Sequence, residues 1–229
     1  KFIIQKEKEK FKGIDLKQRQ HAFGFSLEDL ELILHPMVED GKEATGSMGD
    51  DTPLAVLSDK YRPLYHFFRQ NFSQVTNPPI DSLRENKVMS LKTRFGNLGN
   101  ILDFNNLTEE NIYVLNSPIL SNSQFEKFVK FFGKNFKIFD CTFKLNESLE
   151  EAINNLKKDC EESVRQGVTQ IILSDKNISE KRCTIPMLLC IGAINSNLIN
   201  LGLRGYVSIN VQSGETMDTH SFATMIGMG

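Results

Sequence analysis

The fold class is decided by the stretch Phe136–Asp175, which reads FKIFDCTFKLNESLEEAINNLKKDCEESVRQGVTQIILSD. Its first part, Phe136–Leu145, is rich in aromatic and aliphatic residues and predicts a β-strand. The capping box Ser148-x-x-Glu151 then predicts the start of a long amphipathic helix. The apolar run Thr169–Leu173 predicts a second, buried strand. Because a helix connects the two strands, the stretch predicts a parallel βαβ unit.

The same alternation of strands and helices continues on both sides of this unit. The elements predicted there are a strand over Ile112–Leu115, a helix opened by the box Ser123-x-x-Glu126, a helix over Pro186–Leu201, a strand over Tyr206–Val211 and a helix from Thr216 or Met217. We therefore predict four βαβ units from about Ile112 onward. The predicted fold class is α/β, with a mainly parallel sheet that resembles a partial or degenerate (β/α) barrel. The last predicted helix is still apolar at its end, and we expect the chain to be a piece of a longer protein.

The N-terminal part of the chain has a less regular pattern. We predict a mixed N-terminal lobe over residues 1–110 and a βαβ core over 111–229, or one integrated domain over 1–229. Ser26 is expected to cap a helix that Pro36 closes. The other predicted elements are a buried strand over Leu54–Leu57, a helix from Pro63 with a buried stripe of Leu64, Phe67, Phe68 and Phe72, and a strand over Val88–Leu91.

Composition excludes several classes of function. The 27 Lys and Arg residues balance 29 Asp and Glu residues, which leaves a formal charge of -2 and no basic footprint for a nucleic acid. The sequence has no apolar run of about 18 residues, so no membrane span is predicted. The four cysteines are scattered and fit buried thiols in a reducing cytosol better than a disulfide framework or a metal cluster.

Two loop stretches have a distinctive composition. Gly46–Ser58 reads GSMGDDTPLAVLS and combines flexible glycines with short side chains that bond back to the backbone. It could line a passage, bind an anion through its amides or only turn the chain. Asn77–Asp81 reads NPPID and is followed by Arg84. It could contact a neighbouring domain, or stiffen a crossover that an Asp81–Arg84 bond ties down; we favour the second interpretation.

With Arg19–Phe25 (RQHAFGF) and Gly96–Asn100 (GNLGN), these stretches resemble the central domain of the large subunit of the glutamate synthases. That family makes glutamate from glutamine and 2-oxoglutarate in ammonia assimilation and passes ammonia between two active sites. The resemblance implies a glutamine amidotransferase domain before this segment, and an FMN-binding barrel with an iron–sulfur cluster after it. It implies no cofactor and no catalytic residue within the segment itself.

The resemblance further implies a cytoplasmic oxidoreductase whose electron donor is NADPH, through a small subunit, or ferredoxin. The segment would position the amidotransferase and FMN domains and contribute to the ammonia path. The residues that the resemblance marks as candidates for that path or for contacts between domains are Gly46, Ser47, Met48, Gly49, Asp50, Asp51, Thr52, Asn77, Asp81 and Arg84.

Polar side chains also follow two of the predicted strands. In βαβ folds, functional sites gather at the carboxyl ends of the strands. The residues at those ends, called the strand-end cluster below, are Ser174, Asp175, Ser213, Gly214, Glu215, Asp218 and His220. The alternative function is therefore a free-standing α/β enzyme or a module that binds a phosphate ligand through these loops. The more ordinary interpretation is that Ser and Asp cap helices here, and that Glu215 and Asp218 suit a helix N-terminus.

Overall fold

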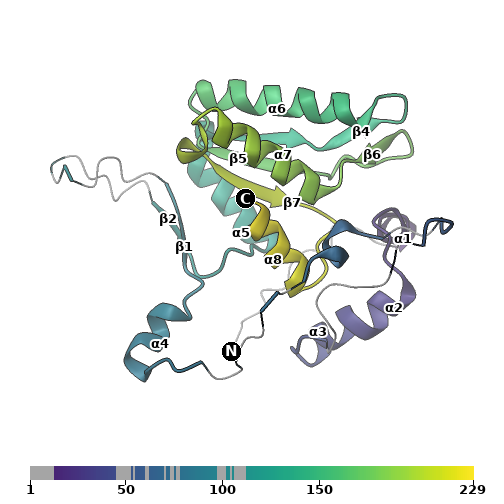
Figure 1. Ribbon diagram of the computed structural model, residues 1–229, viewed down its shortest axis with the longest axis horizontal. Helices are drawn as coiled ribbons and strands as arrows, with labels where there is room; N and C mark the ends of the chain where they lie inside the picture. The colour runs from purple at the N-terminus through teal and green to yellow at the C-terminus, as the bar shows by residue number, and fades with distance from the viewer. Residues whose placement is uncertain are drawn as a thin grey trace.

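A computed structural model describes residues 13–44, 53, 55–59, 62–69, 71–72, 75, 78–96, 102–103, 105 and 112–229. Its centre is a parallel sheet of three strands, which lie side by side in their order along the chain; Figure 1 labels the second and third as β5 and β7. Ile138, Ile172 and Asn210 lie side by side in the register of this sheet. The predicted mainly parallel α/β core is thus confirmed. The three strands are β3 (Phe136–Asp140), β5 (Gln170–Ser174) and β7 (Ser208–Gln212).

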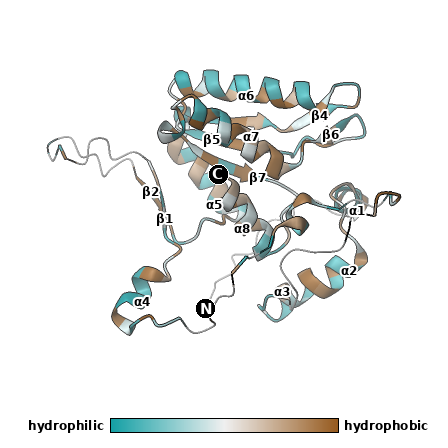
Figure 2. Ribbon diagram, in the orientation of Figure 1, coloured by the Kyte–Doolittle hydropathy of each residue, from teal (hydrophilic) through white to brown (hydrophobic). Residues whose placement is uncertain are grey.

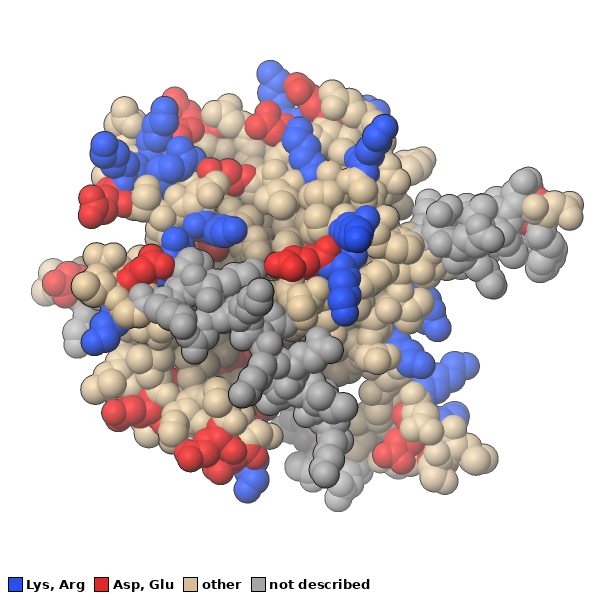
Figure 3. All heavy atoms as spheres, turned by 180° about the vertical axis from the view of Figure 1, so that it is seen from behind, with Lys and Arg blue, Asp and Glu red and all other residues tan. Residues whose placement is uncertain are grey.

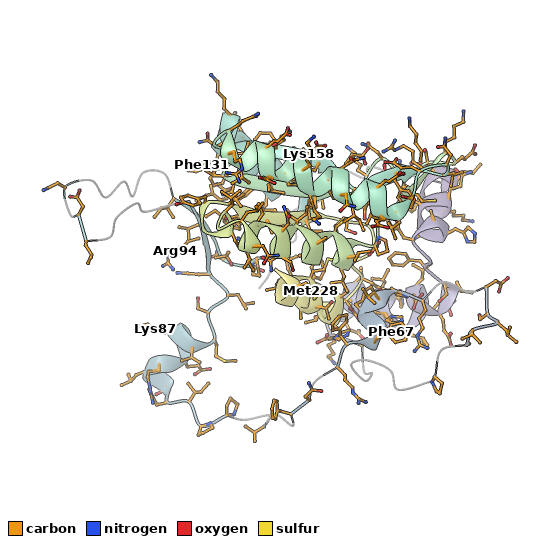
Figure 4. All side chains as sticks on the ribbon, turned by 45° about the horizontal axis from the view of Figure 1, so that its top comes forward. Phe67, Lys87, Arg94, Phe131, Lys158 and Met228 are labelled. Carbon is orange, nitrogen blue, oxygen red and sulfur yellow. The ribbon has the colours of Figure 1, made fainter. Side chains whose placement is uncertain are left out.

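Three long helices pack against one face of the sheet: α6 (Leu149–Arg165), α7 (Met187–Asn200) and α8 (Thr219–Met228). Helix α7 lies between α6 and α8, and Figure 4 shows the three in one layer. The Ser148–Glu151 capping box that begins α6 is present as predicted. Hydrophobic residues gather on the sheet and α7, while the outer side of α6 is hydrophilic (Figure 2). The main core therefore lies between this helix layer and the sheet.

A second, aromatic core lies beside the first. Phe95, Phe128 and Phe132 are buried there, and Phe136 of β3 packs against them. The elements that build this core are α5 (Asn122–Phe132), β1 (Thr93–Phe95) and β2 (Tyr113–Leu115). Strand β2 was predicted, but it pairs antiparallel with β1 instead of joining the parallel sheet. The prediction of four parallel units was therefore wrong, because pairing with β1 depends on contacts that are not local in sequence.

Two predicted element boundaries in this region were wrong for local reasons. Helix α5 is capped by Ser121 with Gln124, not by the box at Ser123. The strand predicted over Phe136–Leu145 breaks at Cys141, because the Asp140 side chain accepts bonds from the N–H and hydroxyl of Thr142 and bends the chain. The second half becomes a strand of a separate antiparallel pair, β4 (Thr142–Lys144) with β6 (Arg182–Thr184).

The N-terminal helix was predicted correctly at its start and wrongly at its end. Ser26 caps it together with Asp29, as expected. Pro36 does not close it: α2 (Leu27–Asp29) continues through a π-helical turn (Leu30–Leu34) into α3 (His35–Glu39). The wider turn lets the chain continue past a proline, which has no N–H to donate. A preceding helix, α1, spans Gly13–Ala22.

The other predictions for the N-terminal lobe fail because local propensity is weak there. Residues 55–59 form a turn with Val56 and Leu57 exposed, so the predicted strand is wrong where it is described. After Pro63 there is one 3-10 turn, Leu64–Phe67, and the predicted aromatic stripe remains partly or largely exposed. The strand predicted over Val88–Leu91 is wrong, because Asp81 caps a helix, α4 (Ser82–Val88), that reaches into it.

The last helix begins later than predicted, at Thr219, because Asp218 caps it. The remaining short 3-10 turns span Gly133–Asn135 and Arg204–Tyr206. Within the described ranges, no helix is both long and apolar enough to cross a membrane.

Candidate functional site

The strand-end cluster forms where β5 and β7 finish at the same edge of the sheet. The Ser174 hydroxyl donates to the side-chain oxygen of Gln212 at 3.1 Å, which joins the two strand ends. The loop after β7 then folds back over the end of β5 and meets Asp175. The structure therefore brings Ser174, Asp175, Ser213 and Gly214 together at this edge.

Asp175 holds the loop that follows β7. The residue is only 2% exposed, and its carboxylate accepts bonds from the Ser213 hydroxyl and from the Gly214 N–H, which lies 3.1 Å from each oxygen. Burial raises the pKa of Asp175, and these two donors partly oppose that effect. Both oxygens of this carboxylate thus already accept hydrogen bonds from the backbone and a side chain of the loop after β7.

Glu215 caps helix α7, although the first residue of that helix lies 28 residues earlier in the chain. Its carboxylate accepts the backbone N–H of Met187 at 3.0 Å, the first residue of α7. The N-cap position of α7 is Pro186, whose side chain has no oxygen to offer, so Glu215 supplies the missing acceptor. Glu215 is 8% exposed, and burial, with a smaller contribution from the charge of Asp175, raises its pKa to about 7.

Asp218 and His220 have different roles at the start of α8. Asp218 accepts the Ser221 N–H at 2.8 Å and is the N-cap that sequence reasoning expected at a helix start. Glu215, which was expected in the same role, serves α7 instead, because the loop folds back toward that helix. The Nε2 atom of His220 lies 2.8 Å from the carbonyl oxygen of Tyr65, to which it donates.

The N-terminal segments contact the same loops. The ring of Phe23 lies so close to Gly214 that a Cβ atom there would sit 2.4 Å from it. Tyr65 is buried in the main core, and its ring meets the ring of His220 edge-on with centroids 6.5 Å apart. Sequence reasoning missed Phe23 and Tyr65 as members of this site. The only signal for Phe23 was its place in the distinctive stretch Arg19–Phe25.

Of the ten candidate residues, Asp81 and Arg84 lie in the described part of the chain. Asp81 caps α4 by accepting the N–H groups of Leu83 and Arg84, at 3.1 and 2.9 Å, and its carboxylate also pairs with the Arg84 guanidinium. The hydrogen bond from the Arg84 side chain is the main reason that the pKa of Asp81 is lowered. This geometry fits the structural interpretation of the pair. The candidates outside the described residues are Gly46, Ser47, Met48, Gly49, Asp50, Asp51, Thr52 and Asn77.

The thiols give no sign of a reactive nucleophile. Cys141, Cys160 and Cys190 are buried, and only Cys183 is exposed. Burial raises the pKa of Cys160, and a hydrogen bond to Cys141 together with burial raises that of Cys190, so both stay protonated. Among the residues that the structure describes, no three His, Cys, Asp or Glu side chains are placed to hold a metal ion.

The arrangement is suited to connecting segments. Both buried carboxylates accept hydrogen bonds from the protein's own backbone, and a phosphate brought to this edge would meet two acidic groups. Basic and acidic side chains are interspersed on the face shown in Figure 3, without a field of one sign. The strand-end cluster thus joins the β5 end, the α7 start and the β7–α8 loop, and the N-terminal segments pack on it.

Comparisons with known proteins cover nearly the whole chain. The family model described as glutamate synthase central domain matches residues 18–229. The large chain of the NADPH glutamate synthase of Azospirillum brasilense is 53% identical over 218 residues, 94% of this chain and 14% of that protein. The corresponding chain of Bacillus subtilis is 42% identical over 226 residues, 98% of this chain and 14% of that protein. The chloroplastic ferredoxin-dependent glutamate synthase of Spinacia oleracea is 41% identical over 218 residues, 93% of this chain and 13% of that protein. The chain thus spans about a seventh of the length of these relatives.

Proposed function

Since this chain belongs to the glutamate synthase central domain family, we propose that it holds the amidotransferase and FMN domains of a longer enzyme in position and contributes to the ammonia path between them. The observation that carries the proposal is the strand-end cluster. Its two buried carboxylates connect three segments of the core through their own hydrogen bonds. Such a cluster gives a rigid frame, because its two carboxylates bond to the backbone of neighbouring segments.

The ammonia path is assigned to the stretch Gly46–Thr52. Ammonia must travel unprotonated, so a conduit needs small side chains, hydrogen-bond acceptors and little bulk water. Glycine, serine and threonine in this stretch meet the first two needs. Asn77, Asp81 and Arg84 are proposed to stiffen a neighbouring crossover and to present it to an adjoining domain; the cap that Asp81 forms on α4 supports the stiffening role.

The activity of the whole enzyme is proposed to be the reductive transfer of the glutamine amide nitrogen to 2-oxoglutarate, with glutamate as the product. FMN and an iron–sulfur cluster, which supply the electron transfer when bound, would belong to the adjoining domain. The electron donor would be NADPH through a small subunit, or ferredoxin, as the names of the two kinds of relative suggest. We place the enzyme in the cytoplasm.

The core sheet is proposed to be part of a barrel-type arrangement. The strands β3, β5 and β7 lie in the sheet in the same order as in the sequence. The helices of the two crossovers, α6 and α7, and the helix after β7, α8, pack on the same face of the sheet. A doubly wound sheet reverses its strand order, whereas a (β/α) barrel adds its strands in the order of the sequence.

The test uses the full-length enzyme with Gly46→Val and Ser47→Val. We expect each variant to hydrolyse glutamine faster than it forms glutamate, because a branched side chain would narrow the conduit and let ammonia escape. The matched control is Gly205→Val, at a glycine with no atom within 4 Å of the added Cβ position. If both variants keep glutamine hydrolysis and glutamate formation equal, the stretch does not guide ammonia.

A further inference from the structure

Strand β7 is bonded along one side only, within the part of the chain that the structure describes. The N–H of Ser208 donates to the carbonyl of Thr169 at 2.9 Å, just before β5. Along a strand, the backbone N–H and C=O groups of successive residues point to alternate sides. Those of Asn210 therefore also face β5, whereas those of Ile209 and Val211 point to the opposite side. No described residue bonds to the backbone of these two.

The composition of this edge is unusual for a strand that remains unpaired. Exposed edges normally carry charged side chains, prolines or bulges, which block pairing with another strand. Strand β7 reads SINVQ and has none of these residues, and its register with β5 is regular. The opposite edge strand, β3, reads FKIFD and includes Lys137 and Asp140. The β7 edge therefore lacks the protection that the β3 edge has.

The helix layer extends past the same edge. Helix α7 packs against both α6 and α8. Figure 1 shows α8 below β7, on the side away from β5. Met225 of α8 is buried in the main core, whereas Ile226 is 61% exposed. In a βαβ crossover the helix covers the strand before it and the strand after it. Only the strand before α8 is present in the sheet.

We propose that the free edge of β7 is an interaction surface that pairs with a further parallel β-strand of the longer glutamate synthase polypeptide. The crossovers from β3 to β5 and from β5 to β7 each add a strand at the same side, and α8 follows β7 as α6 follows β3 and β4 and α7 follows β5 and β6. The relatives are about seven times longer than this chain, so polypeptide is available to supply the strand. The strand would receive the Ile209 and Val211 bonds, and α8 would pack across it.

This proposal rests on the barrel-type arrangement proposed above, and the two can fail separately. Closure of a barrel requires that both edges of the sheet be paired, including the backbone of Ile138 on β3. Pairing at β7 alone leaves the present proposal intact and contradicts closure.

The experiment measures hydrogen exchange at single amides in the full-length polypeptide and in the 229-residue chain. In the full-length protein we expect the amides of Ile209 and Val211 to exchange within about tenfold of the Asn210 amide, which bonds to β5 in both. In the 229-residue chain we expect the same two amides to exchange about 100-fold faster than Asn210. Fast exchange of Val211 in the full-length protein would overturn the proposal.

A density map of the full-length protein identifies the occupant. We expect a parallel strand about 4.8 Å from the backbone of Ile209–Val211. A helix or loop covering this edge would contradict the proposal even if the amides are protected. The 229-residue chain is measured at low concentration, because an unprotected edge can also pair with a second copy of the isolated chain.

Discussion

Replacement of Glu215 by glutamine should stabilise the protein, and the gain should be larger at pH 8 than at pH 5. The carboxylate is buried beside Asp175 and accepts the Met187 N–H. Burial raises its pKa from 4.5 to about 7 in the folded chain. Between those values the folded chain binds more protons than the unfolded chain, so stability falls as the pH rises. Glutamine resembles the protonated acid and does not ionise.

The magnitude follows from the two pKa values. A tenfold change in proton affinity is worth about 1.4 kcal/mol, so ionisation of Glu215 costs the folded state roughly 1 kcal/mol at pH 5 and roughly 3 kcal/mol at pH 8. The E215Q substitution removes this cost. For a chain of this size we expect the advantage in Tm to grow by about 5 to 10 °C between the two pH values.

The assay is thermal unfolding of the wild-type chain and E215Q at pH 5 and pH 8. The matched control is Glu147→Gln, because Glu147 also accepts a backbone N–H, from Lys144 at 3.3 Å, but is less buried. We expect the control to change Tm similarly at both pH values. If E215Q has the same effect on Tm at pH 5 and at pH 8, the assignment of a raised pKa to Glu215 is wrong.

Three further predictions concern single contacts. Asp218→Ala should cost about 1 kcal/mol in urea unfolding, because α8 loses its N-cap, while Asp218→Asn should cost less; equal losses would contradict a capping role. Gly214→Ala should destabilise the chain by about 1 to 3 kcal/mol, because the new methyl group meets the Phe23 ring. Limited proteolysis within residues 13–44 should become faster in this variant. The double variant with Phe23→Leu should recover part of the lost stability. A thiol reagent should label one cysteine rapidly in the native chain, and Cys183→Ser should abolish that labelling; rapid labelling in the variant would show that a buried thiol is accessible.

The parts of the fold that were predicted depend on short-range signals. The start of α6 could be read from Ser148 and Glu151, which bond to each other across one helical turn. The Asp140 turn and the β4–β6 pair could not be read, because Arg182 joins Asp140 and Thr142 from about 40 residues away. The same limit applies to the described residues before α5, where helices and turns are short and few side chains are buried.

The candidate site was predictable in position and not in detail. Parallel strands end at one edge, so the meeting of Asp175 with the loop after β7 follows from the alternation of strands and helices. The bond between Glu215 and Met187 could not be predicted in the same way. Glu215 follows β7 and reaches the start of α7 only because the loop after β7 folds back. The same is true of Phe23, whose contact with Gly214 joins the two ends of the chain.

The distant cap on α7 has a consequence for the order of folding. The caps of α5, α6 and α8 are supplied by residues next to each helix, so they can form as soon as the first turn does. Glu215 reaches Met187 only after β7 has docked and the following loop has reversed, which makes this bond a late event. A change at Glu215 should therefore alter mainly the rate at which the native chain opens, and leave the rate of refolding almost unchanged.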